Sequence, residues 1–211
     1  MSANQKVLVC LDGSNLFHAI SSLGSKDNHY RINYQALLDL FEKEVGTVVK
    51  KFYFSAEPAG KIRDDRAKYV RCLKSMGLDV RSVPLKVKHQ KCKGCGADFD
   101  TFVEKGVDVA LSCEALRYGY QGLATAIVIV SGSGVYLPIV EALQGAGIFV
   151  VIASFKQHCT VSEDLWTKAD KTIDLSNYVE DLRLKFEPKE QPKSPKAISE
   201  AIQDKSPYDN P

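Results

Sequence analysis

The sequence predicts an α/β fold, a three-layer sandwich in which helices cover both faces of a central, mainly parallel sheet. Short apolar runs alternate along the chain with longer segments whose apolar residues recur three and four positions apart. Two of the runs, 125–130 and 148–153, are apolar throughout, which is typical of central strands that are covered on both faces.

Each element is expected from its own pattern. The expected strands are apolar or β-branched runs at 6–12, 47–54, 78–87, 125–130, 148–153 and 172–175. The expected helices carry apolar residues at helical spacing and lie at 16–23, 32–45, 59–76, 107–120, 138–144, 161–169 and 178–184. Gly77 ends the third of these helices, and Gly145 and Gly147 end the fifth.

The composition favours one globular domain followed by a tail. The 211 residues are 45% hydrophobic, enough for a core, and a net charge of +2 gives no global field that would demand nucleic acid or acidic lipid. Five of the eight prolines lie in 187–211, among Lys, Ser, Gln and Glu. We therefore expect a domain over 1–186 and a disordered tail over 187–211, which offers a docking segment for a protein partner.

No secretory signal opens the sequence and no apolar run is long enough to span a bilayer, so we expect a cytoplasmic protein with no membrane partner. Its six cysteines are then expected to be mostly reduced. Four lie in apolar or helical surroundings and are expected to be small core residues: Cys10, Cys72, Cys113 and Cys159.

Asp12 closes the first expected strand. In an open α/β sheet, ligands bind beyond the carboxyl ends of the strands, which places Asp12 where such folds carry out their chemistry. Gly13 permits a sharp turn, and Ser14 and Asn15 can cap the next helix or orient the Asp12 carboxylate. The alternative is that Asp12 and Ser14 only cap a helix.

A second acidic segment opens the helix expected at 107–120. Asp108 lies at its start, where the helix dipole stabilises a carboxylate, so it is either a helix cap or a second ligand at the same crevice. Glu114 lies six residues later, about a third of a turn off the face of Asp108. Asp108 is therefore the better ligand candidate, and Glu114 can assist only from the flank of the helix.

Several segments together resemble the NYN family of the PIN-like nuclease superfamily, and within it the bacterial LabA-type proteins. The resemblance covers about residues 6–180 and is carried by 11–15 (LDGSN), 105–111 (KGVDVAL), 130–132 (VSG) with 137–143 (LPIVEAL), and 165–170 (LWTKAD) with 173–175 (IDL). It implies a parallel sheet with an acidic metal site at its carboxyl edge, and Mg²⁺- or Mn²⁺-dependent cleavage of RNA. Asp12, Asn15 and Asp108 match the family's site, and Glu114 matches a position that is often acidic.

The sequence departs from this family after the strand at 125–130. Such proteins usually carry Ser-Gly-Asp-x-Asp-Phe there, whereas residues 131–136 read Ser-Gly-Ser-Gly-Val-Tyr. Ser133 and Val135 therefore replace two aspartates. A divalent ion that activates water beside a phosphate is usually held by two or more carboxylates. Asp12 and Asp108 are expected to hold Mg²⁺ or Mn²⁺ only weakly, which predicts a nuclease with weakened activity or a pseudoenzyme.

Other polar residues are candidates for binding RNA. Ser14, Ser131 and Ser133 offer hydroxyl groups near the expected site, and the glycines beside Ser133 allow backbone N–H groups to approach phosphate. Lys105 and Arg117 can hold single-stranded RNA, although Arg117 is equally compatible with an ordinary surface position on a helix.

A basic run precedes a CxxC motif. Its side chains are candidates for phosphate contacts or simply a solvated loop: Lys86, Lys88, His89, Lys91 and Lys93. Cys92 and Cys95 provide half of a tetrahedral zinc site, with His89, another loop or a second chain as the source of the remaining ligands. The alternative is a loop with two reduced thiols.

Three functions stay open at this point. The chain is an active metal-dependent ribonuclease with an unusual ligand set, a non-catalytic module that binds RNA in the same cleft, or a regulatory module that acts through its tail. The sequence does not determine the RNA target, the oligomeric state or the pathway.

Overall fold

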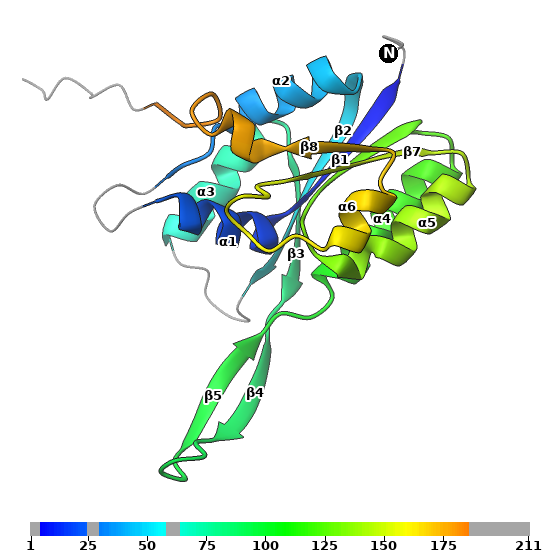
Figure 1. Cartoon of the computed structure of the whole chain (residues 1–211). Helices are drawn as coiled ribbons and strands as arrows, with labels where there is room; N and C mark the ends of the chain where they lie inside the picture. The colour runs from blue at the N-terminus through cyan, green and yellow to red at the C-terminus, as the bar shows by residue number, and fades with distance from the viewer. Residues whose placement is uncertain (1–4, 25–29, 58–63, 186–211) are drawn as a thin grey trace, which may run out of the picture.

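The computed structural model describes residues 5–24, 30–57 and 64–185 (Figure 1). Its centre is a six-stranded sheet in the order β3-β2-β1-β6-β7-β8, and every neighbouring pair is parallel. The strands are β1 (Lys6–Asp12), β2 (Thr47–Glu57), β3 (Asp79–Pro84), β6 (Ala126–Val130), β7 (Phe149–Ser154) and β8 (Lys171–Asp174). The predicted fold class is confirmed.

Helices cover both faces of this sheet. One face carries α1 (Gly13–Leu23), α2 (Tyr34–Glu44) and α3 (Asp64–Ser75), and the other carries α4 (Val107–Tyr120), α5 (Leu137–Gly145) and α6 (Glu163–Lys168) (Figure 1). Side chains of β1 alternate between the two resulting cores, with Val9 and Leu11 in one and Leu8 and Cys10 in the other. Alternation between two apolar layers explains why this strand is apolar along its length.

The order of the strands creates a switch point between β1 and β6. From β1 the chain builds outward through β2 to β3, and it then returns to pair β6 with the opposite edge of β1. In open α/β sheets, the crevice at such a switch point lies outside the carboxyl ends of the two strands. Asp12 ends β1 and Ser131 follows β6, so both lie at this crevice.

Gly13 allows α1 to begin directly after β1. A Cβ atom at this position would lie 2.5 Å from the carbonyl oxygen of Phe54 and 2.6 Å from Cζ of Tyr53. Only glycine therefore lets the turn pass this close to β2, and that close passage fixes Asp12 at the mouth of the crevice.

The strand expected at 78–87 is in fact two elements, which is a correction. β3 ends at Pro84, which has no N–H to continue a ladder, and β4 (Lys86–Lys91) then pairs with β5 (Asp98–Val103) in an antiparallel hairpin. β5 was not predicted, because its side chains are mostly exposed and half of them are polar, unlike the pattern of a half-buried strand. Figure 1 shows the hairpin projecting away from the main sheet.

Smaller differences concern the helices. The short helix expected at 178–184 does not form. A 3₁₀ turn, η2 (Leu175–Tyr178), begins where the Asp174 carboxylate accepts the N–H of Ser176 at 2.9 Å, and the chain after it continues in turns. Another 3₁₀ turn, η1 (Gly134–Tyr136), precedes α5. The start expected for the third helix falls partly in 58–63, and the expected tail lies in 187–211; both lie outside the described residues.

The cysteines are only partly as expected. Cys10 is fully buried, but Cys72 and Cys113 are exposed, because they lie on the outward faces of α3 and α4. All six are free thiols. Among the helices that the structure describes, none is long and apolar enough to cross a membrane.

Candidate functional site

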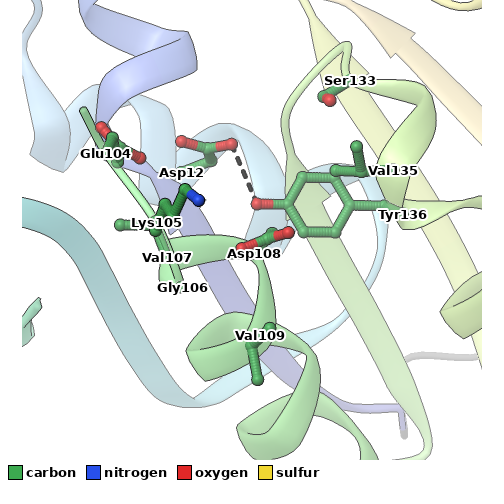
Figure 2. Close-up of a pocket in the computed structure, with 10 residues that line it drawn as sticks. All are labelled: Asp12, Glu104, Lys105, Gly106, Val107, Asp108, Val109, Ser133, Val135 and Tyr136. Atoms are coloured by element: carbon green, nitrogen blue, oxygen red, sulfur yellow. Dashed lines mark hydrogen bonds between the residues drawn. The ribbon is translucent and has the colours of Figure 1, made fainter. Parts of the chain in front are cut away.

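A pocket of about 440 Å³ opens at the carboxyl ends of β1 and β6, beside the first turn of α4 (Figure 2). Three carboxylates and one ammonium group line it, from Asp12, Glu104, Asp108 and Lys105. The loop after β6 closes the opposite side with Ser133, Val135 and Tyr136. The structure thus brings together residues from three distant parts of the sequence, including the two aspartates and the serine that the sequence singled out.

Asp12 is the most buried of the three carboxylates in the pocket, with only 7% of its surface exposed. One carboxylate oxygen, Oδ1, accepts the N–H of Asn15 at 3.1 Å, so Asp12 is also the N-cap of α1. The other, Oδ2, accepts the hydroxyls of Tyr136 at 2.9 Å and Ser131 at 3.1 Å. Asp12 therefore caps α1 and also lines the pocket.

Tyr136 is a site residue that sequence reasoning missed. It is 1% exposed, and Figure 2 shows its hydroxyl pointing at Asp12 across the pocket. Burial, followed by the nearby charge of Asp12, raises the pKa of the Tyr136 phenol far above its ordinary value. The hydroxyl therefore remains protonated and donates to Asp12 at any physiological pH. The sequence offered one signal for Tyr136, because the family pattern carries Phe where this chain has Tyr.

The loop that carries Ser131 and Ser133 is held from α1. The side-chain oxygen of Asn15 accepts the N–H of Gly132 at 3.0 Å, and the Ser131 hydroxyl accepts the N–H of Ser133 at 3.2 Å. A Cβ at Gly132 would lie 3.0 Å from Val161 and 3.1 Å from the carbonyl oxygen of Thr160, so the loop packs tightly. Asn15 and Ser131 thus position the loop and Asp12, rather than lining the pocket.

Asp108 and Lys105 enter the pocket around the start of α4. Gly106 precedes the helix with a φ of +100°, a left-handed conformation that glycine adopts without strain. Asp108 follows in the first turn, where the helix dipole stabilises its charge. Glu104 accepts the hydroxyl of Ser14, so Ser14 holds the segment that leads into the pocket instead of lining it.

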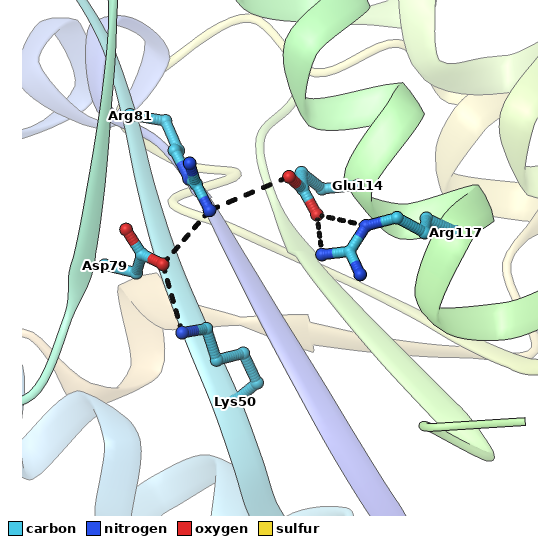
Figure 3. Close-up of polar contacts among 5 residues, drawn as sticks. All are labelled: Lys50, Asp79, Arg81, Glu114 and Arg117. Carbon is cyan, nitrogen blue, oxygen red and sulfur yellow. Dashed lines mark hydrogen bonds and ion pairs between the residues drawn. The ribbon is translucent and has the colours of Figure 1, made fainter. Parts of the chain in front are cut away.

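Glu114 and Arg117 are not among the residues that line this pocket. Figure 3 shows Glu114 accepting hydrogen bonds from Arg117, whose Nε lies 2.9 Å away, and facing Arg81 at 3.9 Å. Asp79 links this group to Lys50 at 3.0 Å, and it pairs with Arg81 at 3.2 Å. The turn of α4 directs Glu114 toward β3, so its charge is neutralised by arginines rather than offered to the crevice.

The pocket fits a divalent ion only in part. Within the ranges that the structure describes, no group of three or more potential His, Cys, Asp or Glu ligands forms. Asp12 and Asp108 are the carboxylates closest to the expected site, and Asp12 already accepts three hydrogen bonds. Mg²⁺ prefers near-ideal octahedral geometry with free oxygen ligands, so this set supports weak binding, and no catalytic step follows from it.

Comparison with known proteins agrees with this fold. The model of the NYN domain matches residues 6–177. The chain belongs to the NYN family. No curated protein matches the sequence of this NYN protein. A crystal structure of a protein of unknown function from Vibrio parahaemolyticus matches with a TM-score of 0.62 at 16% identity, covering 87% of this chain and 99% of that chain. That likeness shows the fold alone.

Proposed function

We propose that this NYN protein binds single-stranded RNA at the pocket beside β1 and β6, and that its metal-dependent cleavage of RNA is strongly weakened. The family is nuclease-like, and an acidic pocket at the carboxyl edge of the sheet is where its chemistry is expected. The finer placement among LabA-type proteins belongs to the same proposal.

The observation that carries the proposal is the set of hydrogen bonds that the Asp12 carboxylate accepts. Its Oδ2 accepts two hydroxyl donors, Tyr136 and Ser131, at positions that a metal ion would otherwise approach. Ser133 and Val135 line the same pocket where the family pattern has aspartates, and neither carries a charge. An ion held by Asp12 and Asp108 would neutralise a scissile phosphate and activate water, but it must first displace a hydrogen bond.

Basic groups next to the pocket support an RNA ligand. Lys105 lines the pocket, and Lys86 pairs with Val103 in the hairpin, two residues before Lys105. Lys88 follows on the same strand, so positive charge continues from the pocket along β4. A row of ammonium groups beside an acidic pocket suits an RNA strand. The ammonium groups would contact its phosphates, while the scissile phosphate enters the pocket. Arg117 adds little to this row because Glu114 engages it.

The test restores the two aspartates. The variant Ser133→Asp/Val135→Asp should cleave single-stranded RNA with Mg²⁺ or Mn²⁺ at least tenfold faster than the natural chain. The matched control is Ser133→Asn/Val135→Asn, which has nearly the same side-chain shape without charge and should stay slow. Adding Asp108→Asn to the aspartate variant should abolish the gain in cleavage rate, because the ion needs the Asp108 carboxylate as well as that of Asp12.

Binding is measured separately from cleavage. Fluorescence anisotropy with a labelled single-stranded RNA should show salt-sensitive binding by the natural chain and by both double variants. Rapid cleavage by the natural chain that the aspartate pair leaves unchanged would show that the missing acids were never needed. Absence of RNA binding in every variant would exclude the RNA part of the proposal.

A further inference from the structure

The hairpin of β4 and β5 lies outside the candidate site and forms a separate two-stranded sheet. Figure 1 shows it extending from the end of β3 with its tip far from the main sheet. Three large apolar side chains on it are exposed: Val87, Phe99 and Phe102. An isolated two-stranded hairpin is marginally stable in water, so this element needs a source of stability beyond its own ladder.

The ion pairs across the hairpin do not supply that stability. His89 contacts Asp100, and Lys91 lies 4.0 Å from Asp98, but all four side chains are largely exposed. Exposed pairs of this kind contribute little, because water and salt screen them. These ion pairs therefore add little to the stability of the hairpin.

Cys92 and Cys95 occupy the turn at the tip. The Cys92 N–H donates to the carbonyl oxygen of Ala97 at 2.8 Å, and the Gly96 N–H donates to that of Cys92 at 2.9 Å. Gly96 has a φ of +72°, which glycine alone adopts without strain. The two hydrogen bonds fold the six-residue turn back on itself and fix its ends.

The Cys92 sulfur faces donors of its own turn. The backbone N–H groups of Gly94 and Cys95 and the Cys95 thiol donate hydrogen bonds to that sulfur. Backbone donors directed at a sulfur favour its thiolate, which is the form that binds metals.

We propose that the tip of this hairpin is half of a zinc site, and that Cys92 and Cys95 of a second copy of the chain complete it. A structural zinc ion takes four ligands in a tetrahedron, and thiolates are preferred ligands. Among the described residues, no third Cys, His, Asp or Glu joins the two cysteines in a group that could hold a metal. His89, the ligand considered from sequence, contacts Asp100 instead.

The chemistry of the tip fits a symmetric pairing of two copies. Four thiolates around one Zn²⁺ leave a net negative charge, and Lys93, which lies between the two cysteines in each copy, would offset part of it. Lys91, which precedes Cys92, faces Asp98 at 4.0 Å. The hairpin projects from the main sheet, so the tips of two copies can meet without contact between their main sheets. Zinc would join the tips of the two hairpins and stabilise them beyond what their backbone hydrogen bonds provide.

The test is the zinc content and mass of the full chain. Reduced protein, titrated with ZnCl₂ and freed of excess metal, should retain about 0.5 zinc per chain and form a dimer in size-exclusion chromatography with light scattering. EDTA should return it to the monomer. Co²⁺ in place of Zn²⁺ should give the thiolate charge-transfer and d–d absorption of a tetrahedral sulfur site.

The decisive variant is Cys92→Ser/Cys95→Ser, which should lose both the zinc and the dimer. The matched control is Cys72→Ser/Cys113→Ser, since those two cysteines are also exposed but lie on α3 and α4. Circular dichroism checks that both variants stay folded. Hydrogen exchange in 86–103 should slow with zinc in the natural chain and not in the tip variant.

Three results would overturn the proposal. Zinc at one ion per monomer would show that a single chain completes the site. A dimer that persists in EDTA would show that zinc does not hold the copies together. A metal-free protein whose mass is lowered by two hydrogens, with Cys92 and Cys95 joined in one peptide, would show that the motif is a disulfide.

Discussion

Replacing Tyr136 with Phe tests the central feature of the site. The substitution keeps the buried ring and removes only the hydroxyl that donates to Asp12 Oδ2 at 2.9 Å. A hydrogen bond to a charged group contributes roughly 1.5–3 kcal/mol, and no cavity forms because the ring stays in place. We expect Tyr136→Phe to lower the free energy of unfolding by about 2 kcal/mol, which corresponds to a fall in Tm of about 4–8 °C.

The same variant should gain affinity for a divalent ion. Without the phenol, Asp12 Oδ2 keeps only the Ser131 hydroxyl and offers a free lone pair to the pocket. Mg²⁺ should therefore raise the Tm of the variant more than that of the natural chain, and an ion at a hundred times its Kd would contribute about 2.7 kcal/mol. Thermal unfolding with and without MgCl₂ measures both effects.

The control for this experiment is Tyr34→Phe. Tyr34 is also buried, but its hydroxyl pairs with the neutral hydroxyl of Tyr69 at 2.6 Å, away from any carboxylate. It should lose only about 1 kcal/mol and show no response to Mg²⁺. The reasoning is refuted if Tyr136→Phe is as stable as the natural chain, or if Mg²⁺ already stabilises the natural chain to the same extent.

Three further predictions follow from the fold and the pocket. Lys105→Ala should weaken binding of single-stranded RNA and reduce the slope of log K against log salt by about 0.7, as anisotropy at several salt concentrations would show; an unchanged slope would place the RNA elsewhere. Gly13→Ala should cost about 1–3 kcal/mol in urea unfolding because its Cβ would meet backbone at 2.5 Å, whereas Gly145→Ala, with no atom within 4 Å, should cost nothing. Burial raises the pKa of Tyr30 to about 12, so its neutral form contributes stability that is complete below pH 10 and is lost as the pH rises toward 12. The urea midpoint should therefore fall more steeply over that range for the natural chain than for Tyr30→Phe, and equal slopes would contradict the shift.

Local patterns in the sequence determined most of the sheet and the place of its first aspartate. The apolar runs at 125–130 and 148–153 predicted central strands, and the structure contains them as β6 and β7. Asp12 was expected at the end of a strand because side chains that close a buried strand face the edge of the sheet. These conclusions depend on burial and periodicity, which neighbouring residues encode.

The partners of Asp12 were decided by the tertiary structure. Tyr136 reaches Asp12 from 124 positions away, through the turn η1, and no local pattern encodes that contact. Glu114 is a similar case in part. Arg117 is its i+3 neighbour on α4, but Arg81 reaches it from β3, and no local pattern encodes that second contact. Such pairings depend on how elements distant in sequence pack together, and periodicity carries no information about them.

For the hairpin too, the sequence determined some features and only the tertiary structure decided the others. The sequence determined the CxxC motif and the basic residues beside it, since these are matters of composition and spacing. Only the structure showed that the motif lies at the tip of a projecting hairpin, because the side chains of β5 are mostly exposed and half of them are polar, so the strand gives no burial signal. Strand pairing there depends on backbone hydrogen bonds between two chain segments, and those bonds leave no mark on hydrophobic periodicity.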